Sequence, residues 1–175
     1  MTDNPVGGTV DAQSTKPETQ VIRLSSLKAE ALAVLEEYYD AVSVVRRDSP
    51  EDVQKLIDDN GSGVWLAYCQ DVVAGCVVMR PVPSIPDAGE CKRLYVRAEH
   101  RGRGIADALM DALEEFAKSI GLRWVYLDTY DDLAAAIALY RKRGYRSCGR
   151  FNDNPQATMF FRKRLESPQR SARLL

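Results

Sequence analysis

A short segment of alternating glycine and arginine is the part of the sequence whose residue types most clearly suggest binding chemistry. It spans residues 101–106 and reads Arg-Gly-Arg-Gly-Ile-Ala, between an apolar, strand-like run and a helical pattern. Glycine tolerates positive φ and lets a ligand approach the backbone, and the N-terminus of a helix favours an anion. With Arg97, His100 and the segment's own arginines, the pattern predicts a pyrophosphate site. A strand-to-helix turn that needs glycine is the simpler alternative.

Two common phosphate motifs do not describe this segment. A P-loop ends in Gly-Lys-Ser/Thr, which is not found here. The dinucleotide fingerprint requires Gly or Ala at the position of Asp107, whose carboxylate would face the pyrophosphate.

The cysteines and the single histidine do not suggest a metal site. Cys69, Cys76, Cys91 and Cys148 include no C-x-x-C pair, whereas structural zinc sites use four Cys or His ligands in clustered pairs. Because each cysteine lies in an apolar run, we expect buried thiols in a reducing compartment. A nucleophilic pair of Cys91 and His100 is the weaker interpretation, since no third group orients it at a recognisable spacing.

The elements that must position these residues follow from hydrophobic periodicity. Apolar residues at helical spacing predict helices over residues 27–42, 50–59, 105–120 and 132–142. Apolar, β-branched runs predict strands over residues 21–24, 64–69, 72–79, 90–96, 123–128, 145–150 and 158–164. We expect Ser25 or Ser26 to cap the first helix and Ser49, followed by Pro50, to cap the second. The order predicts one α/β (α+β) domain with a mixed sheet.

Length and charge restrict the class of protein. The 175 residues fit a domain over 20–165, with flexible tails expected at 1–19 and 166–175. The net charge of −1 divides into −6 for residues 1–60 and +5 for the rest. This balance argues against a nucleic-acid partner but allows a local anion. Because the sequence shows no membrane-length apolar run and no secretory signal, we expect no membrane partner and a cytoplasmic location.

Three stretches together resemble one known family. Residues 101–106 match R/Q-x-x-G-x-G/A, the acetyl-CoA loop of the GNAT superfamily of N-acetyltransferases. Residues 94–96 and 139–145 resemble its fourth strand and its terminal Tyr…Gly-Tyr element, at the expected separations, and the likeness covers about residues 20–165. It implies the GNAT fold: a mostly antiparallel sheet of six or seven strands, splayed between strands 4 and 5 and flanked by about four helices. It also implies acetyl-CoA as co-substrate and no metal.

The resemblance assigns roles to matching residues. The main chain of Leu94, Tyr95 and Val96 is expected to hold pantetheine, and a strand amide there to polarise the thioester carbonyl. Tyr140 is expected to protonate the departing thiolate, unless it is only a core aromatic. The N–H groups expected to hold the pyrophosphate are those of Arg101, Gly102, Arg103, Gly104, Ile105 and Ala106.

The acceptor side of the site is less specific. Glu90 occupies the place of a glutamate base in some members, and deprotonation through water is the rival mechanism. Polyamine-acetylating relatives carry carboxylates where this chain has Lys92 and Arg93, so we expect an acceptor bearing a carboxylate. Solvated or salt-bridged roles for both are equally open. Asn154 lies in a loop expected to overhang the acceptor, although that loop could be only a tight turn.

These features predict an acetyl-CoA-dependent N-acetyltransferase that transfers acetyl to a small amine by direct attack in a ternary complex. A protein lysine or N-terminus as acceptor, and a non-catalytic acyl-CoA-binding module, are the alternatives. We expect a small-molecule partner and a monomer or homodimer.

Overall fold

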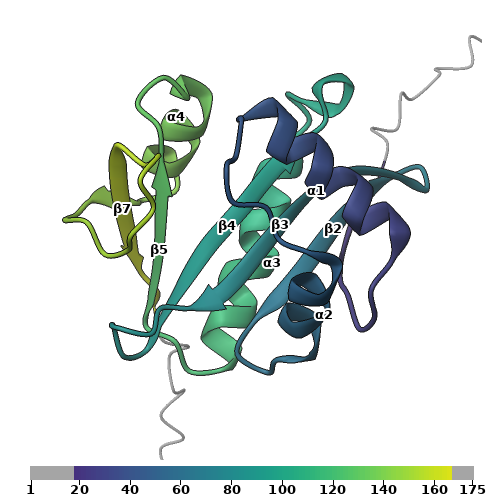
Figure 1. The fold of residues 1–175 in the computed structure, drawn as a ribbon. Coiled ribbons are helices and arrows are strands. Elements are labelled where there is room, and N and C mark those ends of the chain that lie inside the picture. The colour runs from purple at the N-terminus through teal and green to yellow at the C-terminus, as the bar shows by residue number, and fades with distance from the viewer. Residues whose placement is uncertain (1–17, 167–175) are drawn as a thin grey trace, which may run out of the picture.

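A computed structural model describes residues 18–166 as one seven-stranded sheet with helices on both faces (Figure 1). The strands are β1 (Thr19–Arg23), β2 (Gly63–Cys69), β3 (Val72–Pro81), β4 (Ala88–Val96), β5 (Trp124–Thr129), β6 (Arg146–Ser147) and β7 (Met159–Arg164). The helices are α1 (Ala29–Ala41), α2 (Pro50–Asp58), α3 (Ile105–Ser119), α4 (Ala134–Lys142) and the 3₁₀ turn η1 (Ala98–His100). The sheet order is β1-β2-β3-β4-β5-β7-β6, with β4 and β5 parallel and the other neighbours antiparallel.

Strand alternation divides the core between the two faces of the sheet. In β2, Val64 and Leu66 pack with α1 and α2 on one face. Trp65 and Ala67 pack with α3 and with part of α4 on the other. Because successive side chains of a strand point to opposite faces, a buried strand with apolar residues on both faces requires helices on both sides. The expected GNAT fold class is therefore confirmed, with four α-helices and the seven-stranded sheet.

The sheet opens in its middle. β4 and β5 pair only from Ala88 with Trp124 to Cys91 with Leu127. Beyond Cys91, β4 continues to pair with β3 at Lys92, Tyr95 and Val96, but residues 92–96 have no ladder partner on β5 in the described chain. The two strands diverge there, as Figure 1 shows toward the end of the sheet that carries α4. This divergence is the expected splay between strands 4 and 5, and it exposes a strand edge inside the sheet.

A β-bulge in β4 changes which side chains face this opening. The register with β3 shifts between Cys76 and Val78, and Arg93 adopts a φ of +57°. Regular alternation would send Lys92 and Arg93 to opposite faces. The extra residue of the bulge re-aims the strand, and both side chains line the same cavity.

Two local predictions had different outcomes. Ser49 caps α2 as predicted, in a reciprocal pair of hydrogen bonds with Asp52 (3.2 and 3.1 Å). Neither Ser25 nor Ser26 caps α1, which begins after Lys28 without a side-chain cap. That helix relies on its buried face, including Val34 and Leu35, for stability.

The strand expected over 145–150 is wrong in length. It contracts to Arg146–Ser147, because the N–H of Tyr145 still binds the Tyr140 carbonyl at the end of α4 (3.0 Å). The expected tails, 1–19 and 166–175, lie mostly outside the described residues, although Thr19 pairs with Cys69 in the sheet.

All four cysteines are free thiols, and three are buried as predicted, whereas Cys148 is half-buried. Burial raises the pKa of Cys76 to about 12 and that of Cys91 further still. Both thiols therefore stay protonated and inert at neutral pH. Within residues 18–166, no group of three or more His, Cys, Asp or Glu side chains is arranged to hold a metal, and no helix is long and apolar enough to cross a membrane.

Candidate active site

A cavity of about 470 Å³ occupies the opening between β4 and β5. Its walls are the α1–α2 connection (residues 42–49), β4, β5, α4 and the β6–β7 connection (residues 148–158). The predicted site residues among its lining are Lys92, Arg93, Leu94, Tyr140 and Asn154. The fold thus joins residues that are up to 62 positions apart in the sequence. Glu90 and residues 101–106 are not among the lining residues.

Lys92 is held between two carboxylates. Its ammonium lies 2.9 Å from Asp128 Oδ2 and 3.2 Å from Glu90 Oε1, and its side chain is only 11% exposed. Burial would raise the pKa of Asp128, but the charge of Lys92 and the hydrogen bonds from Asn152 and Lys92 outweigh burial and lower it. Asp128 therefore stays ionised, and Lys92 has no free charge to offer an acceptor.

Glu90 is buried rather than exposed at a strand end. Arg80 Nε lies 2.7 Å from its Oε2, and Asn152 Nδ2 donates to its Oε1 at 2.6 Å. The amide of Asn152 also donates to Asp128 at 2.6 Å. With Lys92 as a third partner, both oxygens of Glu90 have partners. This carboxylate therefore belongs to a fixed network of hydrogen bonds and ion pairs.

Arg93 is likewise paired within the protein. Its Nε donates to Asp48 Oδ2 at 3.0 Å, and its guanidinium stacks 5.2 Å from the ring centre of Tyr39. Tyr39 donates its hydroxyl to the same carboxylate oxygen at 2.7 Å. A second guanidinium nitrogen of Arg93 approaches the carbonyl of Arg46 (3.4 Å). Arg93 thus fastens the α1–α2 connection to β4.

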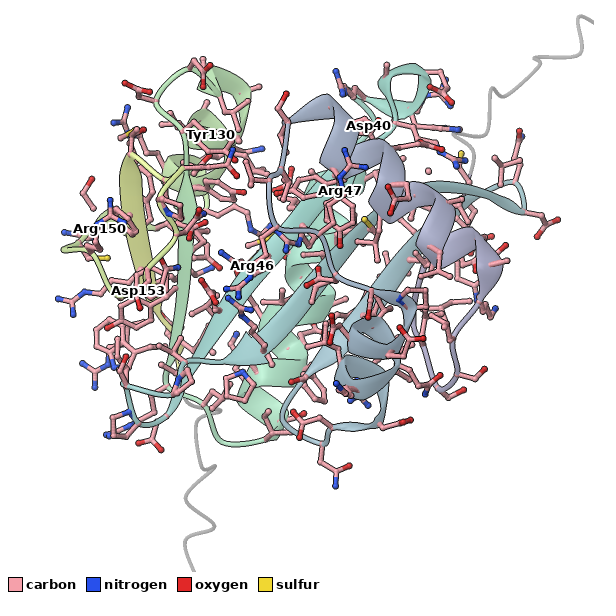
Figure 2. The ribbon with its side chains drawn as sticks, in the orientation of Figure 1. Asp40, Arg46, Arg47, Tyr130, Arg150 and Asp153 are labelled. Carbon is pink, nitrogen blue, oxygen red and sulfur yellow. The ribbon has the colours of Figure 1, made fainter. Side chains whose placement is uncertain are left out.

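Arg46 is one of two cavity cations that the sequence did not single out; the other, Arg80, is paired with Glu90. Arg46 is exposed at the cavity rim, and its guanidinium has no ion pair or hydrogen-bond partner within residues 18–166. In Figure 2 it lies over the opening between β4 and β5. Its neighbour Arg47 points elsewhere and pairs with Glu36 and Asp40, each at 2.7 Å. Two adjacent arginines between helices are the only sequence signal, and it does not say which one faces the cavity.

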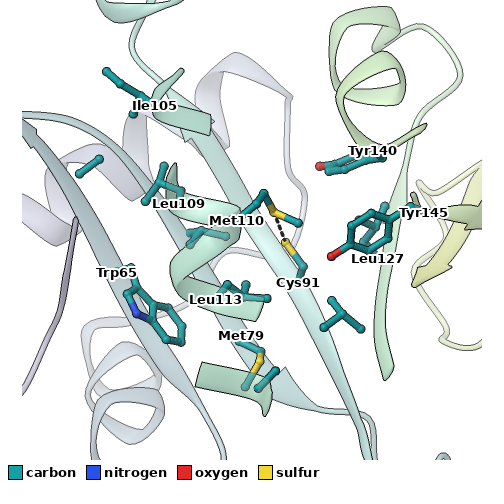
Figure 3. Close-up of a cluster of buried hydrophobic side chains, with 14 of the residues drawn as sticks. Trp65, Met79, Cys91, Ile105, Leu109, Met110, Leu113, Leu127, Tyr140 and Tyr145 are labelled. Atoms are coloured by element: carbon teal, nitrogen blue, oxygen red, sulfur yellow. Dashed lines mark hydrogen bonds between the residues drawn. The ribbon is translucent and has the colours of Figure 1, made fainter. Parts of the chain in front are cut away.

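Tyr140 reaches the cavity from α4. Its ring packs against Tyr145 and Phe161 and is 6% exposed, so it is a core aromatic as well as a lining residue. Its hydroxyl has no hydrogen-bond partner in the described chain and points across the gap toward β4, above Cys91 (Figure 3). Burial raises the pKa of Tyr140 well above its usual value. The phenol therefore remains protonated and able to donate.

The glycine segment lies beyond the end of β4, at the N-terminus of α3. Gly102 and Gly104 have φ values of +73° and +81°, and a Cβ at either would meet nothing within 4 Å. No backbone N–H of residues 102–107 has an acceptor among the described residues. Free N–H groups at a helix start, beside the exposed Arg101 and Arg103, are suited to an anion, and we call residues 101–107 the glycine cradle.

Arg97 does not belong to this cradle. Two of its nitrogens donate to the carboxylate of Glu37 on α1 at 2.8 and 2.7 Å, and a third donates to the Val73 carbonyl. The prediction that Arg97 helps to bind phosphate is therefore wrong. The Nδ1 of His100 is buried without a partner in the described chain.

Residues 94–96 form the edge of β4 that faces the opening. Leu94 and Val96 pack toward α3, whereas Tyr95 packs toward α1, with its ring centre 6.2 Å from that of Tyr38. Asn154 is bound to Asp128 through its Nδ2 at 3.3 Å. Its backbone and side chain otherwise order the β6–β7 connection.

Comparison with known proteins agrees with this geometry. The sequence model of the Acetyltransferase (GNAT) family matches residues 31–145. Rat N-acetyltransferase 8B is 32% identical over 107 residues, which are 59% of this chain and 48% of the relative. The chain spans about half the length of the curated relatives it matches.

Solved structures share the fold. A GNAT-family acetyltransferase from Staphylococcus aureus superposes with a TM-score of 0.71 at 17% identity and covers 85% of this chain and 100% of its own. PaiA N-acetyltransferase from Thermoplasma acidophilum, solved in complex with coenzyme A, gives 0.68 at 16% identity, over 84% of this chain and 99% of its own. The family match over most of the domain, the splayed sheet and the glycine cradle at α3 lead to one assignment: this chain belongs to the acetyltransferase (GNAT) family.

Proposed function

We propose that this protein is an acetyl-CoA-dependent N-acetyltransferase that acts on a small amine bearing a carboxylate. The observation that supports it most is the cavity in which the Tyr140 hydroxyl faces the unpaired edge of β4. An acyl thioester lying along that edge would place its sulfur near a proton donor.

The residues present suit coenzyme A. The unpartnered N–H groups of residues 102–107 and the exposed Arg101 and Arg103 would hold the pyrophosphate. The open edge of β4 at Leu94, Tyr95 and Val96 would pair with the pantetheine amides as an added strand does. Acetyl-CoA is a substrate here and supplies the acetyl group as a thioester.

The transfer requires two proton movements. The neutral amine attacks the thioester carbonyl, a C–N bond forms, the C–S bond breaks, and the sulfur leaves with the bonding electrons. Tyr140 gives its proton to that sulfur and is reprotonated from the cavity water. Its raised pKa keeps the proton available at neutral pH.

For the proton of the amine we favour release through water over a direct transfer to Glu90. Glu90 does not line the cavity, and Arg80, Lys92 and Asn152 occupy both of its oxygens. Accepting a proton would disrupt this network. Glu90 therefore serves to position Lys92 and Asn152.

Arg46 is the residue we assign to the carboxylate of the acceptor. The predicted candidates, Lys92 and Arg93, are neutralised by Asp128, Glu90 and Asp48. The guanidinium of Arg46 is the cavity cation without such a partner in the described chain, and its planar fork can bind a carboxylate bidentately.

The experiment that tests this function measures thiol release from acetyl-CoA with a panel of amines, with and without a carboxylate. Calorimetry measures binding of coenzyme A in parallel. We expect coenzyme A to bind and carboxylate-bearing amines to give the highest kcat/KM. Binding without turnover of any amine would instead support a non-catalytic acyl-CoA module. No binding at all would refute both.

A further inference from the structure

We propose that Gln156 acts as a specificity-determining tie that closes the acceptor cavity to amines in the interior of a polypeptide. The proposal rests on the proposed acetyltransferase function and deepens it by naming the acceptor class. The acceptors that fit are amines of small molecules or of chain ends. In these acceptors the rest of the molecule extends from the amine in one direction, and no polypeptide continues on both sides.

The tie consists of two hydrogen bonds between two segments that line the cavity. Gln156 lies in the β6–β7 connection, and its Nε2 donates to the Ser43 carbonyl at 3.1 Å. Its Oε1 accepts from the backbone N–H of Val45 at 3.1 Å. One side-chain amide therefore uses its donor and its acceptor on a single loop more than 110 residues away, as a strand residue would pair with a neighbouring strand.

Other hydrogen bonds hold the α1–α2 and β6–β7 connections, the two segments that the tie joins. On the α1–α2 side, Arg93 holds the carboxylate of Asp48 and approaches the carbonyl of Arg46. On the β6–β7 side, Arg150 donates to the carbonyls of Asn154 and Ala157 at 2.9 and 3.2 Å. The Gln156 backbone N–H also binds Asn154 Oδ1 at 3.1 Å. These contacts hold both segments in place independently of the tie, so the two hydrogen bonds of Gln156 join segments that are already ordered.

The tie determines the shape of the acceptor that can enter. Val45, Arg46, Asn154 and Gln156 all line the cavity over the opening between β4 and β5. A lysine within a protein carries chain on both sides and would have to lie between the two connections, where Gln156 joins them. A terminal amine enters from one end and leaves the tie intact.

The strength of the tie predicts the size of the effect. Gln156 is half-buried and its two partners, Ser43 and Val45, are exposed, so each hydrogen bond contributes modestly. Loss of both should shift the balance between tied and open forms by about tenfold. A substitution at Gln156 should therefore relax selectivity without abolishing chemistry, because Gln156 does not touch Tyr140 or the glycine cradle.

The test compares one amine in two contexts, as a free amino acid with a side-chain amine and as the same residue inside a blocked hexapeptide. Wild type should acetylate the free form with a kcat/KM at least tenfold higher. Gln156→Ala should reduce that ratio by about tenfold, mainly through KM for the peptide. Gln156→Glu, which keeps only the acceptor for Val45, should fall between them. The control, Gln54→Ala on α2, which does not line the cavity, should leave the ratio unchanged.

Hydrogen exchange provides a readout independent of turnover. The amide of Val45 should exchange faster in Gln156→Ala, whereas amides of α3 should not change. A selectivity ratio that is the same in wild type and Gln156→Ala, with turnover intact, overturns the tie and leaves the acetyltransferase function standing. Equal turnover of both acceptors by wild type also overturns it. If wild type acetylates no amine, the proposed function fails and the tie fails with it.

Discussion

The ammonium of Lys92 lies 2.9 Å from Asp128 Oδ2, directly beyond the last residues that pair β4 with β5. This contact bridges the two strands where backbone hydrogen bonds between them have ended. The ion pair therefore fixes the distance between β4 and β5, two walls of the cavity, at a point where no backbone hydrogen bonds join these strands.

Removing the charge of Asp128 should lower stability in a pH-dependent way. The pKa of Asp128 is lowered in the folded state, so its contribution is present above the unfolded pKa of about 3.9 and is lost as pH falls through the folded pKa. Asp128→Asn should be less stable than wild type at pH 7 in urea unfolding, and the difference should narrow below about pH 4. Asp40→Asn, in an exposed pair with Arg47, should cost little at any pH. A difference that is constant with pH would contradict this account.

Tyr140→Phe tests the proton donor with minimal change in packing. We expect kcat to fall by about 100-fold or more, because general acid assistance is lost while the ring remains. Coenzyme A affinity should not change. Tyr145→Phe is the matched control, since its ring packs on Tyr140 but its hydroxyl binds Glu114 at 3.1 Å. An unchanged rate in Tyr140→Phe would exclude this phenol from the chemistry.

The pH dependence of kcat/KM distinguishes the two routes for the amine proton. If water carries the proton away, the acidic limb should follow the pKa of the acceptor and move when amines of different basicity are compared. A limb that stays fixed would assign the base to an enzyme group such as Glu90. No alkaline fall is expected below pH 10, because burial keeps Tyr140 protonated and raises the pKa of Tyr38 to about 12.

Arg46→Ala should raise KM for carboxylate-bearing amines by about tenfold, the loss of roughly one charge-assisted interaction, and should barely affect the corresponding amides. Arg47→Ala is the control, because Arg47 pairs with Glu36 and Asp40 and does not line the cavity. Steady-state kinetics with matched acid and amide acceptors measures both. An equal loss for acid and amide would show that Arg46 shapes the rim and does not bind the carboxylate.

The backbone at Arg93 allows a test of strain separate from side-chain contacts. Both Arg93→Ala and Arg93→Gly remove the pairing with Asp48, but only glycine accepts a φ of +57° without cost. Arg93→Gly should therefore be more stable than Arg93→Ala by about 1 kcal/mol in chemical denaturation. The same pair of substitutions at Arg162, in β7, should give the opposite order. Equal stabilities at Arg93 would argue that the bulge relaxes.

The sequence predicted the elements whose signals are local. The Ser49 cap and the helix after Gly104 follow from neighbouring residues, and both are present. The resemblance implied the splay, which is present, and pointed to Tyr140, which lines the cavity. The cap and the helix depend on residues a few positions apart, whereas the splay was inferred from three segments that together match one family.

The charge state of the site could not be predicted, because it depends on distant partners. Arg97 binds Glu37, 60 positions away, and Lys92 binds Asp128, 36 positions away. A single sequence gives no way to pair these charges. The residues themselves do not locate the bulge at Arg93, since nothing in Lys-Arg-Leu marks a residue with positive φ. Only the family resemblance indicates that this strand carries a bulge.

The splay leaves residues 92–96 of β4 without a strand partner on β5, in the interior of the described sheet. An open edge at the rim of a sheet recruits strands from other molecules and promotes aggregation. Here residues 92–96 are flanked by α4 on one side and by the Gln156 tie on the other. The proposed coenzyme arm, which is extended and has amide groups of its own, would therefore meet an edge that lies within a cavity and not at the rim of the sheet, where strands of neighbouring molecules can pair.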